Sequence, residues 1–345
     1  MAERDIVVIG GSAGSIESLR TIIPSFPPDL PASVFIVIHT APQSPGYLAE
    51  ILSRMGPLRA RYAKEGETSS RGTIYLAPPD HHLILESPNI MRVIRGPREN
   101  RTRPAVDPLF RSAALAFGPR VIGVVLSGGL DDGTAGLRGI KMCGGTTVVQ
   151  DPADALVSSM PRSALLNVSI DHCVSARELG PLLETLSRTP AVEEAMGDNE
   201  MKGKLRLEVD MAKGHGGIEV TTLGEPSIFT CPECHGTLLK LRGEHPLRFR
   251  CHTGHAFSAD SLLADQSEAT EEAIWNTIRS IQESSMLMTH LAEHWRSIDA
   301  EMSEELLRRA QKAQARVEQV RKIASDHEAV SEEKLARKAH RTPAS

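Results

Sequence analysis

Aromatic residues are scarce in this chain, and positive charge is not in excess. Phenylalanine, tryptophan and tyrosine make up 3% of the 345 residues, and the formal net charge is −5. Proteins that bind nucleic acids use basic surfaces, and those that bind single strands add aromatic side chains that stack on the bases. The composition therefore argues against a nucleic-acid partner, although residues 240–250 include several basic side chains.

Long apolar runs and a secretory leader are also absent from the sequence. No stretch reaches the roughly 20 apolar residues of a transmembrane helix, and the opening Met-Ala-Glu-Arg-Asp has no apolar core. We therefore expect a cytoplasmic protein without direct membrane insertion, whose five cysteines do not form disulfides. A hydrophobic content of 40% gives ample core for one α/β domain, and the chain is too long for only one.

A serine lies in a glycine-lined turn near the N-terminus. Residues 5–15 read Asp-Ile-Val-Val-Ile-Gly-Gly-Ser-Ala-Gly-Ser, with Ser12 in the turn. A strand-to-helix turn of this kind exposes a hydroxyl beside free helix N–H groups, which suits a nucleophile or a phosphate site. A dinucleotide-binding loop does not fit, because Ile9 occupies the place of a required glycine and His39, not an acid, follows the next strand. A G-x-S-x-G hydrolase elbow fits the residues, although that elbow normally follows several strands, and a serine that merely caps the helix is the third interpretation.

Further polar residues follow apolar strands in a way that favours a catalytic site. His39 closes the apolar run 34–38, and Asp131 and Asp132 follow the unbroken apolar run 121–126. Such runs are typical of buried parallel strands, whose carboxyl ends share one edge of a sheet. A nucleophile, a base and an orienting acid at that edge form the arrangement that acyl transfer requires.

Longer segments add to the serine turn, the histidine strand end and the late Asp-Gly. They read Thr-Ile-Tyr-Leu-Ala-Pro-Pro-Asp-His-His (73–82), Asn-Arg-Thr-Arg-Pro-Ala-Val-Asp-Pro-Leu-Phe (100–110) and Met-Pro-Arg (160–162). With them, residues 5 to about 188 resemble the catalytic domain of the CheB-type protein-glutamate methylesterases of bacterial chemotaxis. The resemblance implies an α/β fold with a doubly wound, mostly parallel sheet over residues 1–188.

The resemblance also implies a serine hydrolase that needs no cofactor for catalysis. The family's nucleophile falls on Ser12, its general base on His39 and its orienting acid on Asp132, and Asp131 is the less favoured acid. The oxyanion donors would be the backbone N–H groups of Ala13 and Gly129. The implied reaction is hydrolysis of glutamate γ-methyl esters on chemotaxis-type receptors. The implied partners are the cytoplasmic helices of the methylated receptors, and signalling proteins. Glutamine deamidation is the family's second activity.

This chain departs from the family pattern around the expected site. Ser15 replaces the usual second glycine after the nucleophile, Ile38 stands where glutamine commonly precedes the histidine, and Gly129-Leu130 replaces Met-Gly. These changes alter the wall of the substrate cleft. The alternative function is therefore a catalytically altered, CheB-like binding or scaffold protein that acts through its C-terminal modules.

Two arginines in the middle segment have two possible placements. Arg101 and Arg103 could face the substrate cleft and engage an acidic receptor helix, a contact that salt would weaken. They could equally lie in solvent. The sequence leaves both placements open.

The regulation of the implied esterase is expected to differ from that of the well-known family members. Those proteins carry a phosphate-accepting receiver domain ahead of the esterase, whereas the first strand here begins at Asp5. We therefore expect regulation from the C-terminal third rather than from phosphorylation in cis. That third opens with residues 189–226, whose polar, glycine-rich composition predicts a flexible linker.

A cysteine and histidine pattern follows the predicted linker. Cys231-Pro-Glu-Cys234 and Cys251-His-Thr-Gly-His255 have a spacing that suits tetrahedral zinc held by two knuckles. We therefore predict a structural zinc in a ribbon-like module at residues 227–258, with those three cysteines and His255 as ligands. The alternates for the fourth ligand are His235 and His252.

The last part of the chain is predicted to be helical. After Ser258, a residue suited to cap a helix, apolar residues recur at steps of three and four, which predicts helices within residues 259–330. They could pair as a hairpin, dimerise as a coiled coil or dock on the esterase. Ser285 and Ala292 weaken the apolar seam and so favour a hairpin or docking. Residues 331–345 are predicted to be a disordered basic tail.

Overall fold

The computed structural model describes residues 3–191, 199–215, 218–243 and 246–326. The chain forms two compact units, of which the first ends at Leu262 and the second begins at Leu263. The tail expected at residues 331–345 lies outside the described residues.

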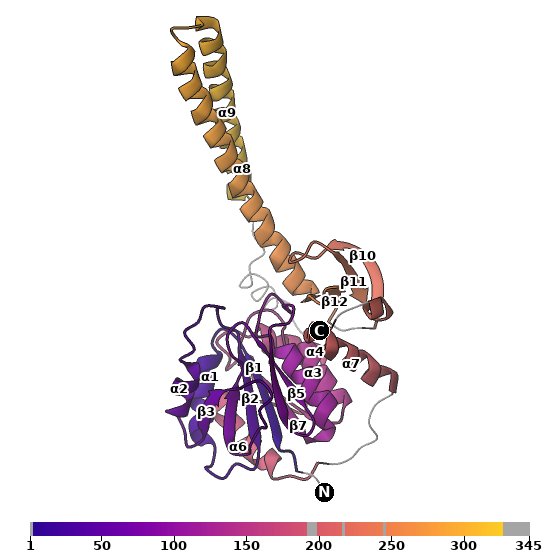
Figure 1. Ribbon diagram of the computed structural model, residues 1–345. Coiled ribbons are helices and arrows are strands. Elements are labelled where there is room, and N and C mark those ends of the chain that lie inside the picture. The colour runs from indigo at the N-terminus through magenta and orange to yellow at the C-terminus, as the bar shows by residue number, and fades with distance from the viewer. Residues whose placement is uncertain (1–2, 192–198, 216–217, 244–245, 327–345) are drawn as a thin grey trace, which may run out of the picture. The chain divides into compact units, whose positions relative to one another are not determined.

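A seven-stranded sheet forms the centre of the first unit (Figure 1). Its order is β3-β4-β2-β1-β7-β8-β9, and every neighbouring pair is parallel. The strands are β1 (Ile6–Gly11), β2 (Ser33–Ile38), β3 (Arg59–Tyr62), β4 (Thr73–Leu76), β7 (Val121–Val125), β8 (Thr146–Gln150) and β9 (His172–Val174). The apolar runs predicted as buried strands are β2 and β7, and every residue of both is buried. The α/β fold with a parallel sheet is therefore confirmed.

Helices cover both faces of the sheet, as a parallel sheet requires. One face carries α1 (Ser15–Ile22), α2 (Leu48–Ser53) and α6 (Ala176–Ser187). The other carries α3 (Val106–Phe117), α4 (Thr134–Met142), α5 (Ser159–Asn167) and the hairpin of β5 (His82–Glu86) and β6 (Ile90–Ile94). Short 3-10 helices span Ile23–Ser25, Gly118–Arg120 and Ile218–Thr222. The chain is thus wound on both sides of β1, which leaves the carboxyl ends of β2, β1 and β7 side by side.

The segment expected to be a flexible linker contains a helix, so that expectation is wrong for part of residues 189–226. Helix α7 (Asn199–Ala212) packs against α3. Its Val209 and Ala212 join Ile84 of β5 in one apolar cluster, whereas Met211 joins a second cluster with Leu239 of the following module. The average composition of the segment is polar, so it gave no sign of the apolar residues near the end of α7. These residues are buried on two faces of the helix.

A small antiparallel sheet follows α7 and matches the predicted ribbon-like module. Its strands are β10 (Gly224–Thr230), β11 (Thr237–Leu241), β12 (Arg248–Cys251) and β13 (Ala256–Ser258), in that order. Leu238, Phe249 and Phe257 form its core together with two of the cysteines. We call this sheet the ribbon.

Buried charges join the ribbon, α7 and α3. Arg250 contacts Glu99 and Glu208 at 3.0 Å each. Arg248 also pairs with Glu208, and Arg111 of α3 pairs with Glu99. Each of the five side chains belongs to a residue that is 5% exposed or less. Burial alone would raise the pKa of Glu99, but Arg111 and Arg250 hold that pKa below its ordinary value. We call these five residues the ion cluster.

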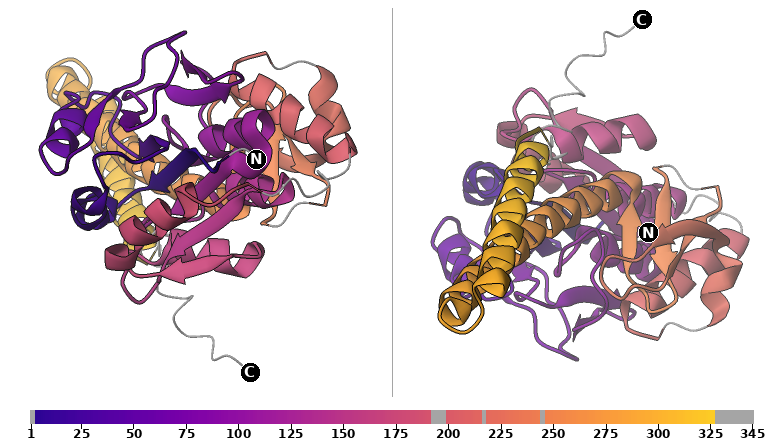
Figure 2. Two further views of the ribbon diagram at one scale, coloured as in Figure 1. Left: turned by 90° about the horizontal axis from the view of Figure 1, so that it is seen from below. Right: turned by 90° about the horizontal axis from the view of Figure 1, so that it is seen from above.

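The second unit contains a helical hairpin. Helix α8 (Ala259–Trp295) begins in the first unit and continues into the second, where α9 (Ala300–Asp326) runs beside it (Figure 2). Ser285 Oγ donates to Ala310 O at 3.0 Å, and Ser303 Oγ donates to Ala292 O at 2.7 Å. Ser285 and Ala292, the small residues that weaken a coiled-coil seam, thus take part in contacts between the two helices. Among the described residues, no helix is both long and apolar enough to span a membrane.

The ion cluster predicts a large stability difference between two arginines of the ribbon. Removing one member of a buried ion network leaves an uncompensated charge and costs about 3 kcal/mol or more. Arg250→Ala is therefore expected to lower the free energy of unfolding by about that amount. Arg242 pairs with Glu225 where the two side chains are 59% and 70% exposed, so Arg242→Ala is expected to cost less than about 1 kcal/mol.

Urea unfolding followed by circular dichroism measures both losses. Equal losses for the two variants would show that the ion cluster does not stabilise the first unit.

Candidate active site and metal cluster

The three polar residues predicted to form a catalytic site lie at neighbouring strand ends. Ser12 follows β1, His39 follows β2, and Asp132 lies in the loop after β7. His39 N donates to Gly11 O at 3.2 Å, and Ser12 N donates to Ser127 O at 2.9 Å. Since the chain winds in opposite directions from β1 to β2 and from β1 to β7, this is the switch point at which α/β proteins bind ligands.

The turn after β1 needs glycine and leaves Ser12 free of a capping role. Gly14 has a φ of 82° and is the N-cap of α1, with no side-chain cap. A Cβ on Gly14 would lie 2.6 Å from Ser127 Oγ and 2.7 Å from Leu156 Cβ. The turn is therefore too crowded for a larger residue. Ser12 does not cap α1, so the capping interpretation of this serine is wrong.

The loop after β7 is fastened to the serine turn. Ser127 Oγ donates to Ala13 O at 2.8 Å, and Ser127 N donates to Gln150 Oε1 at 3.0 Å. Gly128 lies so close to Ser12 that a Cβ added to it would be 2.9 Å from Ser12 Cβ. In the described chain, neither Ala13 N nor Gly129 N has a hydrogen-bond partner. The two predicted oxyanion donors are thus uncommitted.

Asp132 holds the imidazole of His39. His39 Nε2 lies 2.8 Å from Asp132 Oδ2, and Asp132 is 2% exposed. The carboxylate also accepts hydrogen bonds from Asn100 Nδ2 (3.0 Å), Val106 N (2.6 Å), Asp107 N (3.2 Å) and Gly133 N (2.9 Å). Burial alone would raise the pKa of Asp132, but His39, Val106 N and the Asn100 amide hold that pKa below its ordinary value. The carboxylate is therefore ionised at neutral pH.

The serine and the histidine do not share a hydrogen bond in the described structure, in which Ser12 Oγ has no partner. Catalytic hydrogen bonds of this kind commonly tighten only when substrate binds. His39 Nδ1 is the ring nitrogen that Asp132 does not engage. The structure thus brings His39 and Asp132 into contact and places Ser12 on the adjoining strand end.

The neighbouring aspartate has a different partner. Asp131 Oδ1 accepts a hydrogen bond from Ser258 Oγ at 2.6 Å. Burial raises the pKa of Asp131 to about 7. Of the two aspartates that the sequence offered, Asp132 is the one in contact with His39.

The two arginines considered as substrate contacts lie in the loop before α3. Arg103 donates to Asp80 Oδ1 at 2.9 and 2.7 Å and to Gly96 O at 2.6 Å. Its side chain is 14% exposed, so Arg103 is engaged within the fold and does not lie free in solvent. Arg101 is half-buried and has a φ of 70°.

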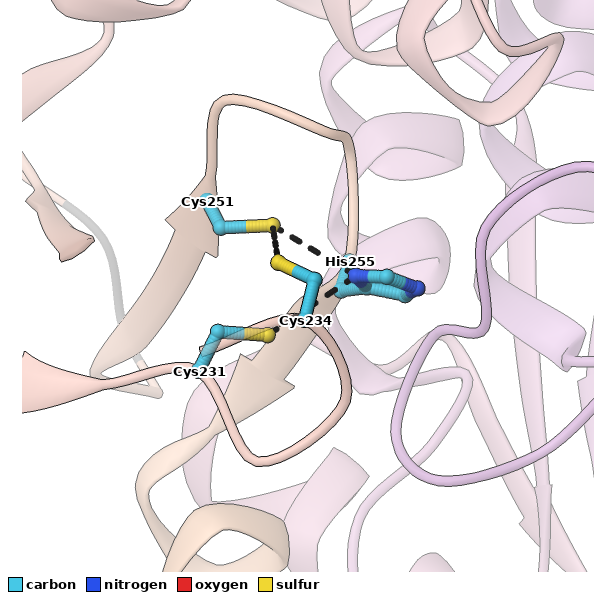
Figure 3. Close-up of side chains that lie close together, drawn as sticks. All are labelled: Cys231, Cys234, Cys251 and His255. Atoms are coloured by element: carbon cyan, nitrogen blue, oxygen red, sulfur yellow. Dashed lines mark hydrogen bonds between the residues drawn. The ribbon is translucent and has the colours of Figure 1, made fainter. Parts of the chain in front are cut away.

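The cysteine and histidine pattern of the ribbon closes into one cluster (Figure 3). The ligand atoms of Cys231, Cys234, Cys251 and His255 all lie within 4.8 Å of one another. The sulfurs of Cys234 and Cys251 are 3.6 Å apart, and His255 Nδ1 lies 3.7 Å from Cys231 Sγ and 3.5 Å from Cys251 Sγ. Ideal tetrahedral zinc gives about 3.8 Å between sulfurs and about 3.6 Å between sulfur and nitrogen. The cluster could therefore hold a four-coordinate metal ion, with His255 as the histidine ligand.

Four residues around these sites had no functional role in the sequence analysis. Ser127 and Gln150 fasten the loop after β7, and Asn100 and Ser258 reach the two aspartates. Asn100 opens a segment shared with the resembled family, which was a signal without an assigned role. Gln150 and Ser127 had no signal, because their partners are distant in the chain.

Comparisons with known proteins agree on residues in the first unit. The model of the CheB methylesterase family matches residues 7–183. A relative from Leptospira interrogans, provisionally named a protein-glutamate methylesterase/protein-glutamine glutaminase, is 36% identical over 184 residues, which cover 53% of this chain and 95% of the relative. A protein of the same two named activities from Anaeromyxobacter dehalogenans is 36% identical over 187 residues, which cover 54% of each chain.

A solved structure supports the same conclusion. The crystal structure of the Thermotoga maritima CheB methylesterase catalytic domain matches with a TM-score of 0.52 and 33% identity, over 54% of this chain and 100% of that domain. The ribbon and the helical hairpin lie beyond the residues that the family model matches. With just over half of its length matched by the family model, this chain belongs to the CheB methylesterase family.

Proposed function

We propose that the protein is a serine-dependent protein-glutamate methylesterase that acts on the cytoplasmic helices of methylated chemotaxis-type receptors. The observation that carries the proposal is the contact between His39 and a buried, ionised Asp132, one strand away from Ser12. Membership of the CheB methylesterase family supports the substrate class. The uncommitted N–H groups of Ala13 and Gly129 support an acyl-transfer reaction.

The reaction proceeds in two steps. His39 takes the proton of Ser12, and Ser12 Oγ attacks the carbonyl carbon of a glutamyl γ-methyl ester. Ala13 N and Gly129 N bind the oxyanion, and methanol leaves with the proton from His39. His39 then activates water, which hydrolyses the acyl-enzyme to glutamate and restores Ser12. Asp132 holds the imidazole and stabilises its protonated form.

The proposal predicts that methanol release depends on one hydroxyl. With a methylated receptor cytoplasmic fragment as substrate, Ser12→Ala is expected to lower kcat about 1,000-fold or more, because the nucleophile is lost. Ser169→Ala changes an exposed serine of the same unit and is expected to keep the wild-type rate. Equal background release from the wild type and Ser12→Ala would refute the esterase function for this substrate and favour a binding or scaffold role.

A second activity is expected at the same serine. In glutamine deamidation the leaving group is ammonia instead of methanol, and the acyl-enzyme and its hydrolysis are the same. A receptor fragment with unmodified glutamines should therefore release ammonia with the wild type and not with Ser12→Ala. Methanol release without ammonia release would limit the enzyme to esters.

We further propose that the metal of the ribbon is zinc and that its role is structural. Three thiolates and one imidazole are the ligands that zinc prefers in closed, four-coordinate sites. Cys231 and Cys251 are fully buried at 0% exposure, and thiolates this close together repel one another unless a cation lies between them. Four protein ligands leave no open position for a substrate.

Metal analysis of the purified protein tests this site. About one zinc ion per chain is expected in the wild type, and close to none in Cys231→Ser/Cys234→Ser. Cys173→Ser changes an exposed cysteine outside the cluster and should keep the zinc. A wild type without bound zinc, or a double variant that keeps it, would contradict the assignment.

A further inference from the structure

The end of the ribbon and the first turn of α8 lie against the loop of Asn100. Asn100 N donates to Ala256 O at 2.8 Å, and Ala256 N donates to Arg98 O at 3.3 Å. Glu99 forms a parallel β-bridge with Ala256. Strand β13 thus pairs, through backbone groups, with the loop that leads into α3. We call Ser258 and Ser261 the junction serines.

The side chain of Asn100 connects the junction serines to the aspartate of the catalytic site. Its Nδ2 donates to Asp132 Oδ1 at 3.0 Å and to Asp107 Oδ2 at 3.2 Å. Its Oδ1 accepts from Ser258 N at 3.0 Å and from Ser261 Oγ at 3.3 Å. An amide offers two N–H donors and two acceptor sites, so every hydrogen-bonding position of Asn100 is used. Asn100 is 8% exposed, and both junction serines are buried.

We propose that the ribbon and the start of α8 form a positioning element of the esterase, in which Ser258 and Ser261 hold Asn100 and Asn100 orients Asp132 against His39. This inference rests on the proposed esterase function. It assigns the part of the chain beyond the family match a role in catalysis, through residues that do not touch the substrate.

The backbone around Asn100 shows why outside support is needed. Asn100 and Arg101 have φ values of 47° and 70°. This left-handed backbone conformation costs free energy in residues other than glycine, less in asparagine than in arginine. Two such residues in succession stay ordered only when neighbouring contacts hold them. The contacts of Asn100 with Ala256 and Ser258 supply that hold from the ribbon side.

A second contact carries the same junction to the neighbouring aspartate. Ser258 Oγ accepts from Ser261 N at 3.0 Å, as an N-cap does, and donates to Asp131 Oδ1 at 2.6 Å. The N-cap expected of Ser258 is therefore formed, and the same hydroxyl donates a hydrogen bond to the residue directly before Asp132. The junction thus touches the loop after β7 as well as the loop before α3.

Asp132 has other hydrogen-bond donors, but none of them has the same connection as Asn100. Val106 N, Asp107 N and Gly133 N belong to the part of the chain that the family model matches. They neutralise the carboxylate, but Asn100 is the donor that also contacts the junction serines. Loss of the junction is therefore expected to disturb the orientation of Asp132 and to leave its burial intact.

The test compares three variants of the full-length protein. Asn100→Ala removes the connection. Ser258→Ala/Ser261→Ala removes the Ser261 hydroxyl that donates to Asn100 and the Ser258 hydroxyl that donates to Asp131, and keeps the backbone donor Ser258 N. Ser280→Ala changes an exposed serine of α8 as a control. The first readout is the NMR signal of the His39 imidazole N–H, which reports its hydrogen bond to Asp132 and needs no substrate. The second readout is kcat and KM for methanol release. Zinc content and thermal melting identify any variant that fails to fold, and Ser261→Ala then serves as the milder test.

The expected result is a shifted or broadened His39 signal and a kcat about 10-fold to 100-fold lower in Asn100→Ala, with KM unchanged within about twofold. Ser258→Ala/Ser261→Ala, which keeps the contact of Ser258 N with Asn100, is expected to change both readouts in the same direction and by less. Ser280→Ala should match the wild type. A His39 signal and a kcat that stay at wild-type values in folded Asn100→Ala and Ser258→Ala/Ser261→Ala would overturn the inference. An inactive wild type whose His39 signal still responds to Asn100→Ala would refute the esterase function and support the positioning role.

Discussion

The burial of one ionised carboxylate organises the candidate active site of this molecule. Asp132 is 2% exposed, and a buried, ionised carboxylate is tolerated only when its oxygens accept hydrogen bonds from the protein. The fold meets that demand from three directions. The first amides of α3 supply two donors, the turn before α4 supplies one, and Asn100 supplies a side-chain donor. The one remaining donor is His39, so the geometry that neutralises the charge also fixes the imidazole.

The strand ends of the candidate site could be predicted from the sequence because the signals for them are local. Unbroken apolar runs identify buried parallel strands, and the polar residue that ends each run lies at a shared edge. Ser12, His39 and Asp132 could therefore be grouped before any contact was known. The departure Gly129-Leu130 was also visible in the sequence, but its consequence was not. Leu130 has a φ of 58°, so leucine adopts there a backbone conformation that glycine adopts without strain, at a cost of about 1 kcal/mol or more.

Contacts between distant segments could not be predicted in the same way. Ser258 and Asn100 are far apart in the chain, and nothing in the composition around either residue refers to the other. Helix α7 was missed for a related reason. Its segment is polar on average, and its buried apolar residues pack against two different neighbours, β5 and the ribbon. A periodicity that assumes a single buried face does not detect a helix that is covered from two sides.

The charges of the ion cluster show that the limit of the family match is not a limit of the folded unit. Asp107 lies beside the ion cluster, 3.8 Å from Arg111. Of these six residues, Glu99, Asp107 and Arg111 lie within the matched residues, while Glu208, Arg248 and Arg250 lie beyond them. Together they are three acids and three arginines, which balance when all are ionised. Without α7 and the ribbon, two buried acids would face one arginine. Burial and the charge of Asp132 already raise the pKa of Asp107 to about 6, so further loss of positive charge would act next to the carboxylate that we propose as catalytic. The ribbon therefore completes the electrostatics of the esterase core as well as binding to its surface.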